Sequence, residues 1–214
     1  PEALRETAYY IDYQGVRIVA LDSNREIEAQ AVWLDKVLGE NPHEWSVVTF
    51  HHPLFSSREG RNNSRNRAAW KPILDKHKVD LVLQGHDHTY ARGHTPVRMT
   101  DGGSPKAVTT MYVNSVSGPK MYEFMKAGWD VYRPDGVILD RRAEDTTFFQ
   151  VIRIEGPRLV YKAYMANGEL YDAFELGKRE DGSKEMRDWS PDLGDERRRE
   201  VTAEEAREAQ DKHQ

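Results

Sequence analysis

The sequence predicts an α/β protein built as a layered sheet with helices on its outside. Between Tyr9 and Leu83, apolar runs of strand length alternate with two segments of helical period, an order typical of a parallel sheet. Between Thr147 and Leu176, consecutive strand-like runs are separated only by turn residues, which predicts an antiparallel finish. Sheets of this class present functional side chains at the carboxyl ends of their parallel strands.

The chain opens with a predicted hairpin and a predicted helix. Tyr9 to Tyr13 and Val16 to Leu21 read as two strands joined at Gln14-Gly15. Ser23 to Glu26 matches a capping box, and the apolar residues that follow it at helical spacing predict a helix. We expect this helix to end at Gly39, because glycine is common just past a helix.

A second helix between two strands continues the alternation. Trp45 to Phe50 reads as a buried strand, Ala68 to His77 as a helix, and Val79 to Leu83 as the next strand. Pro72 is expected within the first turn or two of that helix, where its missing N–H costs little. A further strand is predicted at Val108 to Val113, after the loop that follows the strand at Val79 to Leu83.

The remaining chain divides into three parts. Ser115 to Asp145 has no clean period and is expected to be a long ordered excursion over one end of the sheet. The antiparallel strands are predicted at Thr147 to Ile154, Leu159 to Met165 and Leu170 to Leu176. The domain is expected to span residues 1–177. Residues 178–214 are so rich in charge that they predict a solvated tail, with a possible terminal helix after Thr202.

Composition limits the possible partners and metals. The net charge of −5 and the pI near 5.9 argue against nucleic acid or an anionic membrane as the main partner, and no apolar run is long enough to span a bilayer. Cysteine is absent, so a metal would be held by imidazole, carboxylate or other oxygen ligands. That donor set favours zinc, iron, manganese or magnesium.

Histidines follow two of the predicted strands directly. His51 and His52 come after the strand predicted at Trp45 to Phe50, and His86 and His88 follow Gly85 after the strand predicted at Val79 to Leu83. If the chain stays extended past Gly85, the latter two point to the same side, about 7 Å apart. The connecting helix should bring the two strand ends together, so three or four imidazoles would share one edge of the sheet. Imidazoles gathered without thiolates suit zinc or iron.

These motifs resemble those of a known family. His51 to Ser56 (His-His-Pro-Leu-Phe-Ser) and Gly85 to Arg92 (Gly-His-Asp-His-Thr-Tyr-Ala-Arg) look like the last two motifs of the calcineurin-like metallophosphoesterases, in particular the purple acid phosphatase branch. The resemblance implies a four-layer α/β/β/α sandwich. It also implies an acid phosphatase type of hydrolase with two metal ions, divalent or of mixed valence, and a small phosphorylated substrate. It suggests a secreted or periplasmic enzyme.

The resemblance also implies roles for individual residues of this sequence. It implies that His51 and His86 bind one metal ion, that His88 binds the other, and that a metal-bound hydroxide attacks phosphorus. His52 follows a ligand directly and, on an extended backbone, would face the opposite way. We therefore expect His52 to support the site without binding metal. Arg61 or Arg58 could clamp phosphate, and the acid that protonates the leaving group is unassigned.

Three earlier motifs of the family are missing from this sequence, among them the one whose aspartate bridges the two metals. The chain therefore looks like the carboxyl-terminal half of such a domain, inactive alone and completed by an amino-terminal half. Two alternatives stay open. The chain could be a non-catalytic binding module with a phosphoesterase-like fold, or a mononuclear zinc hydrolase that uses His51, His86 and His88. The substrate and the identity of the metal are not indicated.

Overall fold

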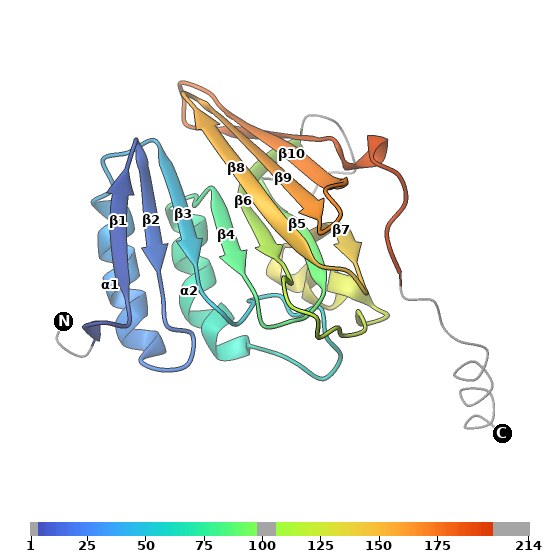
Figure 1. The fold of residues 1–214 in the computed structure, drawn as a ribbon. Coiled ribbons are helices and arrows are strands. Elements are labelled where there is room, and N and C mark those ends of the chain that lie inside the picture. Colours follow the sequence, from blue (N-terminus) through green and yellow to red (C-terminus); the bar gives the residue numbers. More distant parts are fainter. Residues whose placement is uncertain (1–3, 98–105, 199–214) are drawn as a thin grey trace, which may run out of the picture.

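Four parallel strands form the centre of the computed structural model, which describes residues 4–97 and 106–198 (Figure 1). They are β2, β3, β4 and β6, with bounds Val16–Ala20, Trp45–Thr49, Leu81–Gln84 and Lys106–Asn114. Helices α1 (Ile27–Gly39) and α2 (Ser64–Lys76) connect the first three and lie on the same face of the sheet. The predicted α/β class is confirmed.

Apolar side chains cover both faces of this sheet. Val19, Val48 and Val82 belong to the core beneath the helices. Val47 and Leu81 belong to a second core, shared with the antiparallel strands from the end of the chain. Successive side chains of a strand point to opposite faces, so a strand buried on both sides reads as a continuous apolar run.

The predicted hairpin is confirmed at the first edge of the sheet. β1 (Tyr9–Tyr13) pairs antiparallel with β2. The two residues of the turn, Gln14 and Gly15, have φ values of 46° and 83°. Positive φ at both positions gives a turn whose twist matches that of the flanking strands.

Helix α1 is present, but the predicted capping box is wrong. Glu26 occupies the N-cap position in a left-handed conformation without a capping side-chain hydrogen bond. The Ser23 hydroxyl contacts His52 instead. The entry to the helix is held by the buried Gln30, whose amide donates to the Asp22 carbonyl at 2.7 Å and accepts from the Asp22 N–H at 2.8 Å. A tertiary contact has replaced the local one.

Helix α2 begins earlier than predicted, and Pro72 therefore lies in its interior. A proline there removes one helical hydrogen bond and costs about 3 kcal/mol. Trp70 and Leu74 on either side of it are fully buried, so packing offsets the local cost.

Among the helices of the described residues, none has the length and apolarity needed to cross a membrane.

Two strands in the middle of the chain were not predicted. β5 (Tyr90–Pro96) pairs with β6 and with β7 (Ile138–Ala143), both antiparallel. β7 lies within the expected excursion, which also contains the 3-10 helix η2 (Gly128–Asp135). The excursion is thus partly regular and supplies a strand to the sheet. Residues 98–105, in the loop predicted before the strand at Val108 to Val113, lie outside the described residues.

The antiparallel strands predicted near the end of the chain are confirmed, and a further strand follows them. β8 (Phe148–Glu155), β9 (Arg158–Met165) and β10 (Leu170–Lys178) form a meander. β11 (Lys184–Asp188) then pairs with β10 and β6. The expectation of a solvated tail is wrong for this segment, because its charged side chains find buried partners. The predicted helix after Thr202 lies outside the described residues.

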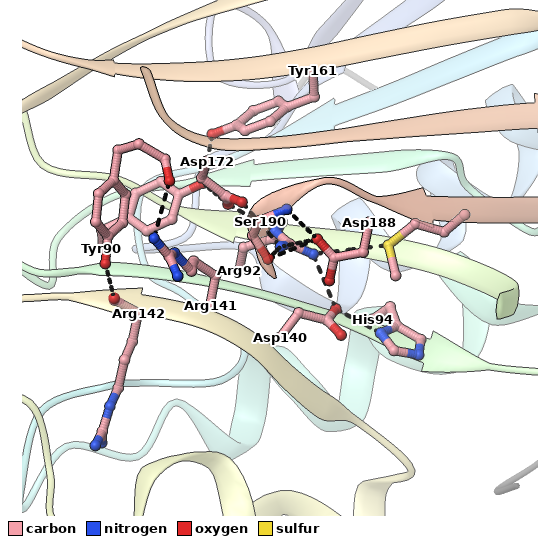
Figure 2. A network of polar contacts seen from close by, with 12 residues as sticks. Tyr90, Arg92, His94, Asp140, Arg141, Arg142, Tyr161, Asp172, Asp188 and Ser190 are labelled. Carbon is pink, nitrogen blue, oxygen red and sulfur yellow. Dashed lines mark hydrogen bonds and ion pairs between the residues drawn. The ribbon is translucent and has the colours of Figure 1, made fainter. Parts of the chain in front are cut away.

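A buried polar network explains how charged strands enter the core (Figure 2). Arg92 on β5 is fully buried and donates to Asp172 on β10 at 2.7 Å and to Asp188 on β11 at 3.0 Å. It also lies 3.4 Å from Asp140 on β7, which pairs with His94 at 2.6 Å. Charged side chains can be buried when they are paired in this way. The network joins β5, β7, β10 and β11.

Candidate metal centre

Two neighbouring parallel strands carry the histidine motifs at their carboxyl ends. β3 and β4 pair in parallel, and α2 connects them. Beyond the strands, the N–H of Gly85 donates to the carbonyl of His51 at 3.0 Å. The prediction that these two strand ends lie side by side is therefore confirmed.

Three imidazoles meet at this edge. His51 Nε2 and His86 Nδ1 are 2.9 Å apart, and the His52 and His86 ring centroids are separated by 4.2 Å. Each of the three rings offers one nitrogen, and these nitrogens all lie within 4.8 Å of one another. His51 is exposed and the other two are partly buried, so the cluster is open to solvent on one side.

The expectation that His52 faces away from His51 is wrong. The backbone bends at residues 51–52 and does not continue the extended strand, which turns the His52 ring toward the cluster. Its Nδ1 lies 2.8 Å from the Ser23 hydroxyl oxygen, which also accepts the His52 backbone N–H at 3.0 Å. Burial lowers the pKa of His52, and the charges of His51 and Arg61 lower it further. The ring is therefore neutral at neutral pH.

His86 also departs from the expected geometry. Its φ is 67°, so the chain does not stay extended past the glycine that precedes it. Burial lowers the pKa of His86 to about 4, together with the charges of Arg61, His52 and His51. A neutral imidazole keeps the lone pair that a metal ion requires.

His88 does not join the cluster with His86. Its Nδ1 lies 2.7 Å from the carbonyl oxygen of Lys120, and its ring packs against Tyr122 with the centroids 4.7 Å apart. A carbonyl oxygen only accepts hydrogen bonds, so Nδ1 carries the proton and the neutral ring has its lone pair on Nε2. A backbone acceptor on the far nitrogen is the usual support of a metal-binding histidine.

Asp87 lies between His86 and His88 and connects the loop after β4 with the loop after β3. Its buried carboxylate accepts from the Ser56 hydroxyl at 2.6 Å, the Ser57 backbone N–H at 2.7 Å and Arg61 Nη1 at 2.5 Å. Arg61 also donates to the His86 carbonyl at 3.3 Å. Arg61, which we expected to hold phosphate, is thus engaged by the protein itself.

Sequence reasoning missed the role of Asp87. A carboxylate between two histidines looks like a solvated charge, because nothing in the local pattern marks it as buried. The only residues in the sequence that could have indicated its role are Ser56 and Ser57, in the loop after His51-His52-Pro53. They do so only when it is known that this loop meets the loop that carries Asp87. Asp12 and Asp22 lie elsewhere: Asp12 pairs with Arg17, and Asp22 pairs with Arg25.

The donor set of the cluster fits a single metal ion. Three imidazoles on one side of a solvent-open site are the ligands expected for zinc or iron with a position left for water or substrate. Within the described residues, no carboxylate belongs to this cluster. A second ion near His88 would need negative ligands that the cluster does not provide.

The chain is similar to known phosphoesterases in sequence. Residues 3–90 match the family model for calcineurin-like phosphoesterases, a range that contains all four histidines discussed above. An uncharacterized protein of Mycobacterium tuberculosis is 34% identical over 90 residues, which cover 38% of this chain and 17% of that protein. Purple acid phosphatase 4 of Arabidopsis thaliana is 33% identical over 78 residues, covering 35% of this chain and 23% of that enzyme.

The fold is similar to that of a solved purple acid phosphatase. The superposition with the enzyme PPD1 from yellow lupin seeds covers 92% of this chain and 36% of PPD1, with a TM-score of 0.59 and 19% sequence identity. This likeness supports the mixed α/β fold. The chain spans about a fifth of the length of the curated relatives described above.

Proposed function

Because residues 3–90 match the calcineurin-like phosphoesterase family model and a purple acid phosphatase is among the similar proteins, we propose that the chain forms the metal-binding part of a metal-dependent phosphoric-ester hydrolase. The observation that carries this proposal is the meeting of three imidazoles at the carboxyl ends of two parallel strands. His51 and His86 come from different strands, and their ring nitrogens converge without any carboxylate to pair with them.

In this proposal, His51 and His86 hold one metal ion and His88 holds a second. When bound, the ions supply the Lewis acidity that activates water and stabilises charge on the phosphoryl oxygens. The Lys120 carbonyl keeps the His88 proton on Nδ1 and so leaves Nε2 toward the site. His52, held by Ser23, is neutral at neutral pH and can accept a proton beside the cluster.

Arg61 has a positioning role in this proposal. Its guanidinium is paired with the buried Asp87 and bonded to the His86 carbonyl, so gripping phosphate would leave Asp87 without its charge partner. We propose that Arg61 fixes the loop that carries His86. Its positive charge also favours the neutral form of that ring.

A two-metal site further needs bridging carboxylates, which we propose come from an amino-terminal partner segment that completes the domain. The chain alone would then bind one ion firmly and be inactive as a phosphatase. We propose that the domain includes β11, because this strand pairs with β6 in the central sheet.

Metal content tests the proposal directly. The chain is incubated with zinc, iron or manganese, freed of excess metal, and analysed by inductively coupled plasma mass spectrometry. We expect about one ion per chain, and loss of that ion in His51→Ala and His86→Ala. His77→Ala is the matched control, since His77 lies on α2 and pairs with Asp35.

Two outcomes would contradict this assignment. Retention of the ion by both cluster variants would mean that the histidines do not bind it. Two ions per chain, with phosphatase activity toward p-nitrophenyl phosphate, would mean that the chain completes its own site and needs no partner segment.

The three-imidazole cluster also favours a second candidate, a mononuclear zinc hydrolase. Catalytic zinc sites commonly use three protein ligands and an open fourth position. In this alternative the ligands are His51, His52 and His86, and His88 has no metal to bind. Esterase activity at one zinc per chain, lost in His52→Ala but retained in His88→Ala, would favour it over the two-metal proposal.

A further inference from the structure

Three cationic side chains gather around one partly buried aromatic ring next to His88. The Arg58 guanidinium lies 4.0 Å from the centroid of the Tyr122 ring, the Lys120 ammonium 5.1 Å and the Arg61 guanidinium 5.7 Å. Lys120 and Arg58 also lower the pKa of the Tyr122 hydroxyl, most strongly through a hydrogen bond from Lys120. Positive charge is therefore concentrated at one point on a protein of net charge −5.

Two of these cations are not neutralised by the protein. Arg61 pairs with the buried Asp87 at 2.5 Å. Within residues 4–97 and 106–198, neither Arg58 nor Lys120 forms an ion pair with a carboxylate. Both charges lie close to the same ring, and an anion bound at that ring would be attracted by both of them.

The group is fixed directly beside His88. The backbone N–H of Tyr122 donates to the His88 carbonyl at 3.1 Å, and the Lys120 carbonyl lies 2.7 Å from His88 Nδ1. The His88 ring and the Arg58 guanidinium both contact the Tyr122 ring, at 4.7 and 4.0 Å from its centroid, so an elongated anion bound at His88 could extend along Tyr122 toward Arg58.

A cavity of about 600 Å³ opens at the same place, and Arg58 and Tyr122 are among its lining residues. This volume is in the range of small-molecule binding sites. Three carboxylates, those of Glu59, Glu123 and Asp145, also line the cavity. An anion is consequently limited to the part of the cavity next to Arg58, because the carboxylates would repel it elsewhere.

We propose that Arg58, Lys120 and Tyr122 form a subsite for a second anionic group, so that the preferred substrates are phosphoric esters or anhydrides whose leaving group carries a further phosphate or carboxylate. The inference rests on the proposed function for the phosphate that is cleaved. The subsite itself depends only on the charges and contacts around Tyr122. Guanidinium and ammonium groups supply charge-assisted hydrogen bonds to such an anion.

The test compares pyrophosphate with orthophosphate by isothermal titration calorimetry on the zinc-loaded chain, with zinc retention checked after each titration. We expect wild-type protein to bind pyrophosphate more tightly than orthophosphate. Arg58→Ala and Lys120→Ala should each weaken pyrophosphate about tenfold or more, the usual effect of losing one charge-assisted hydrogen bond, with little change for orthophosphate. Lys126→Ala removes an exposed charge from the same segment and should change neither affinity.

The outcomes separate this inference from the proposed function. If the chain binds zinc and orthophosphate but Arg58→Ala and Lys120→Ala leave the preference for pyrophosphate intact, the subsite is refuted and the metal site stands. If no metal is retained, yet pyrophosphate binds and is lost in both variants, the subsite stands and the proposed function fails. Equal affinity of wild-type protein for the two anions would overturn the inference.

Discussion

Replacing Asp87 by asparagine should destabilise the protein by about 3 kcal/mol. The carboxylate is buried and accepts from Ser56, Ser57 and Arg61 at 2.5–2.7 Å. Breaking a buried ion pair by removing one partner costs about 3–5 kcal/mol. Asparagine keeps the shape and one acceptor oxygen, and the Arg61 side chain is 20% exposed and can turn to water, so the lower end of that range applies.

Urea unfolding measures this cost, with Asp130→Asn as the control because its ion pair with Arg133 is about 70% exposed on both sides. Arg61→Ala should cost a similar amount to Asp87→Asn, and the double variant clearly less than the sum, because both substitutions break one interaction. A cost below about 1 kcal/mol for Asp87→Asn, or full additivity, would refute the view that this pair holds the two loops together.

Three further results are expected. Ser23→Ala removes the partner of His52, so it should weaken zinc binding about tenfold under the mononuclear alternative, in which His52 is a ligand, and change it little under the two-metal proposal. The helicity of α1, measured by circular dichroism, should be unchanged in either case. Gly93→Ala should lower the melting temperature sharply, since its Cβ would lie 2.2 Å from a backbone oxygen of β7, whereas Gly177→Ala meets no atom within 4 Å and should not. Burial raises the pKa of Asp140, but its hydrogen bond with the neighbouring histidine and nearby cations outweigh this and lower it from 3.8 to about 2. The stability that this group adds is therefore complete above pH 4 and lost as the pH falls toward 2. Urea unfolding at several pH values should show a loss of about 2 kcal/mol over that window, reduced in Asp140→Asn.

The elements that the sequence predicted correctly are those decided by local pattern. The hairpin, the parallel strands and the meander have apolar runs of strand length and turn residues between them, and both signals act within a few residues. Gln14-Gly15 illustrates this, because both residues take positive φ without help from the rest of the chain.

The elements that were missed are stabilised by partners far away in the sequence. β5 carries Arg92 and His94 in the core, and β11 buries Lys184. Each needs a distant partner: Asp172 for Arg92, Asp140 for His94 and Asp80 for Lys184. Charged strands of this kind look solvated until the fold that supplies their partners is known.

The candidate site was predictable up to the ends of its strands. The convergence of His51 and His86 follows from two parallel neighbours, which the alternating pattern indicates. The places of His52 and His88 depend on the backbone after the strands, where a bend and a positive φ replace the extended chain that we assumed. Side-chain direction beyond the last strand residue is set by loop contacts, such as those of Asp87.

The charge of the ligands decides how many ions this chain can hold. Two divalent ions about 4 Å apart repel each other by roughly 17 kcal/mol at an effective dielectric constant of 20. His51, His52 and His86 are neutral donors, so they bind an ion without reducing this repulsion. Asp87 follows His86 directly in the sequence, but its carboxylate is buried and paired with Arg61. The cluster itself therefore does not offset the repulsion that a second ion beside His88 would meet. If an amino-terminal segment supplies the bridging carboxylates, as we propose, adding that segment should raise the metal content from one ion to two and produce phosphatase activity in the same step.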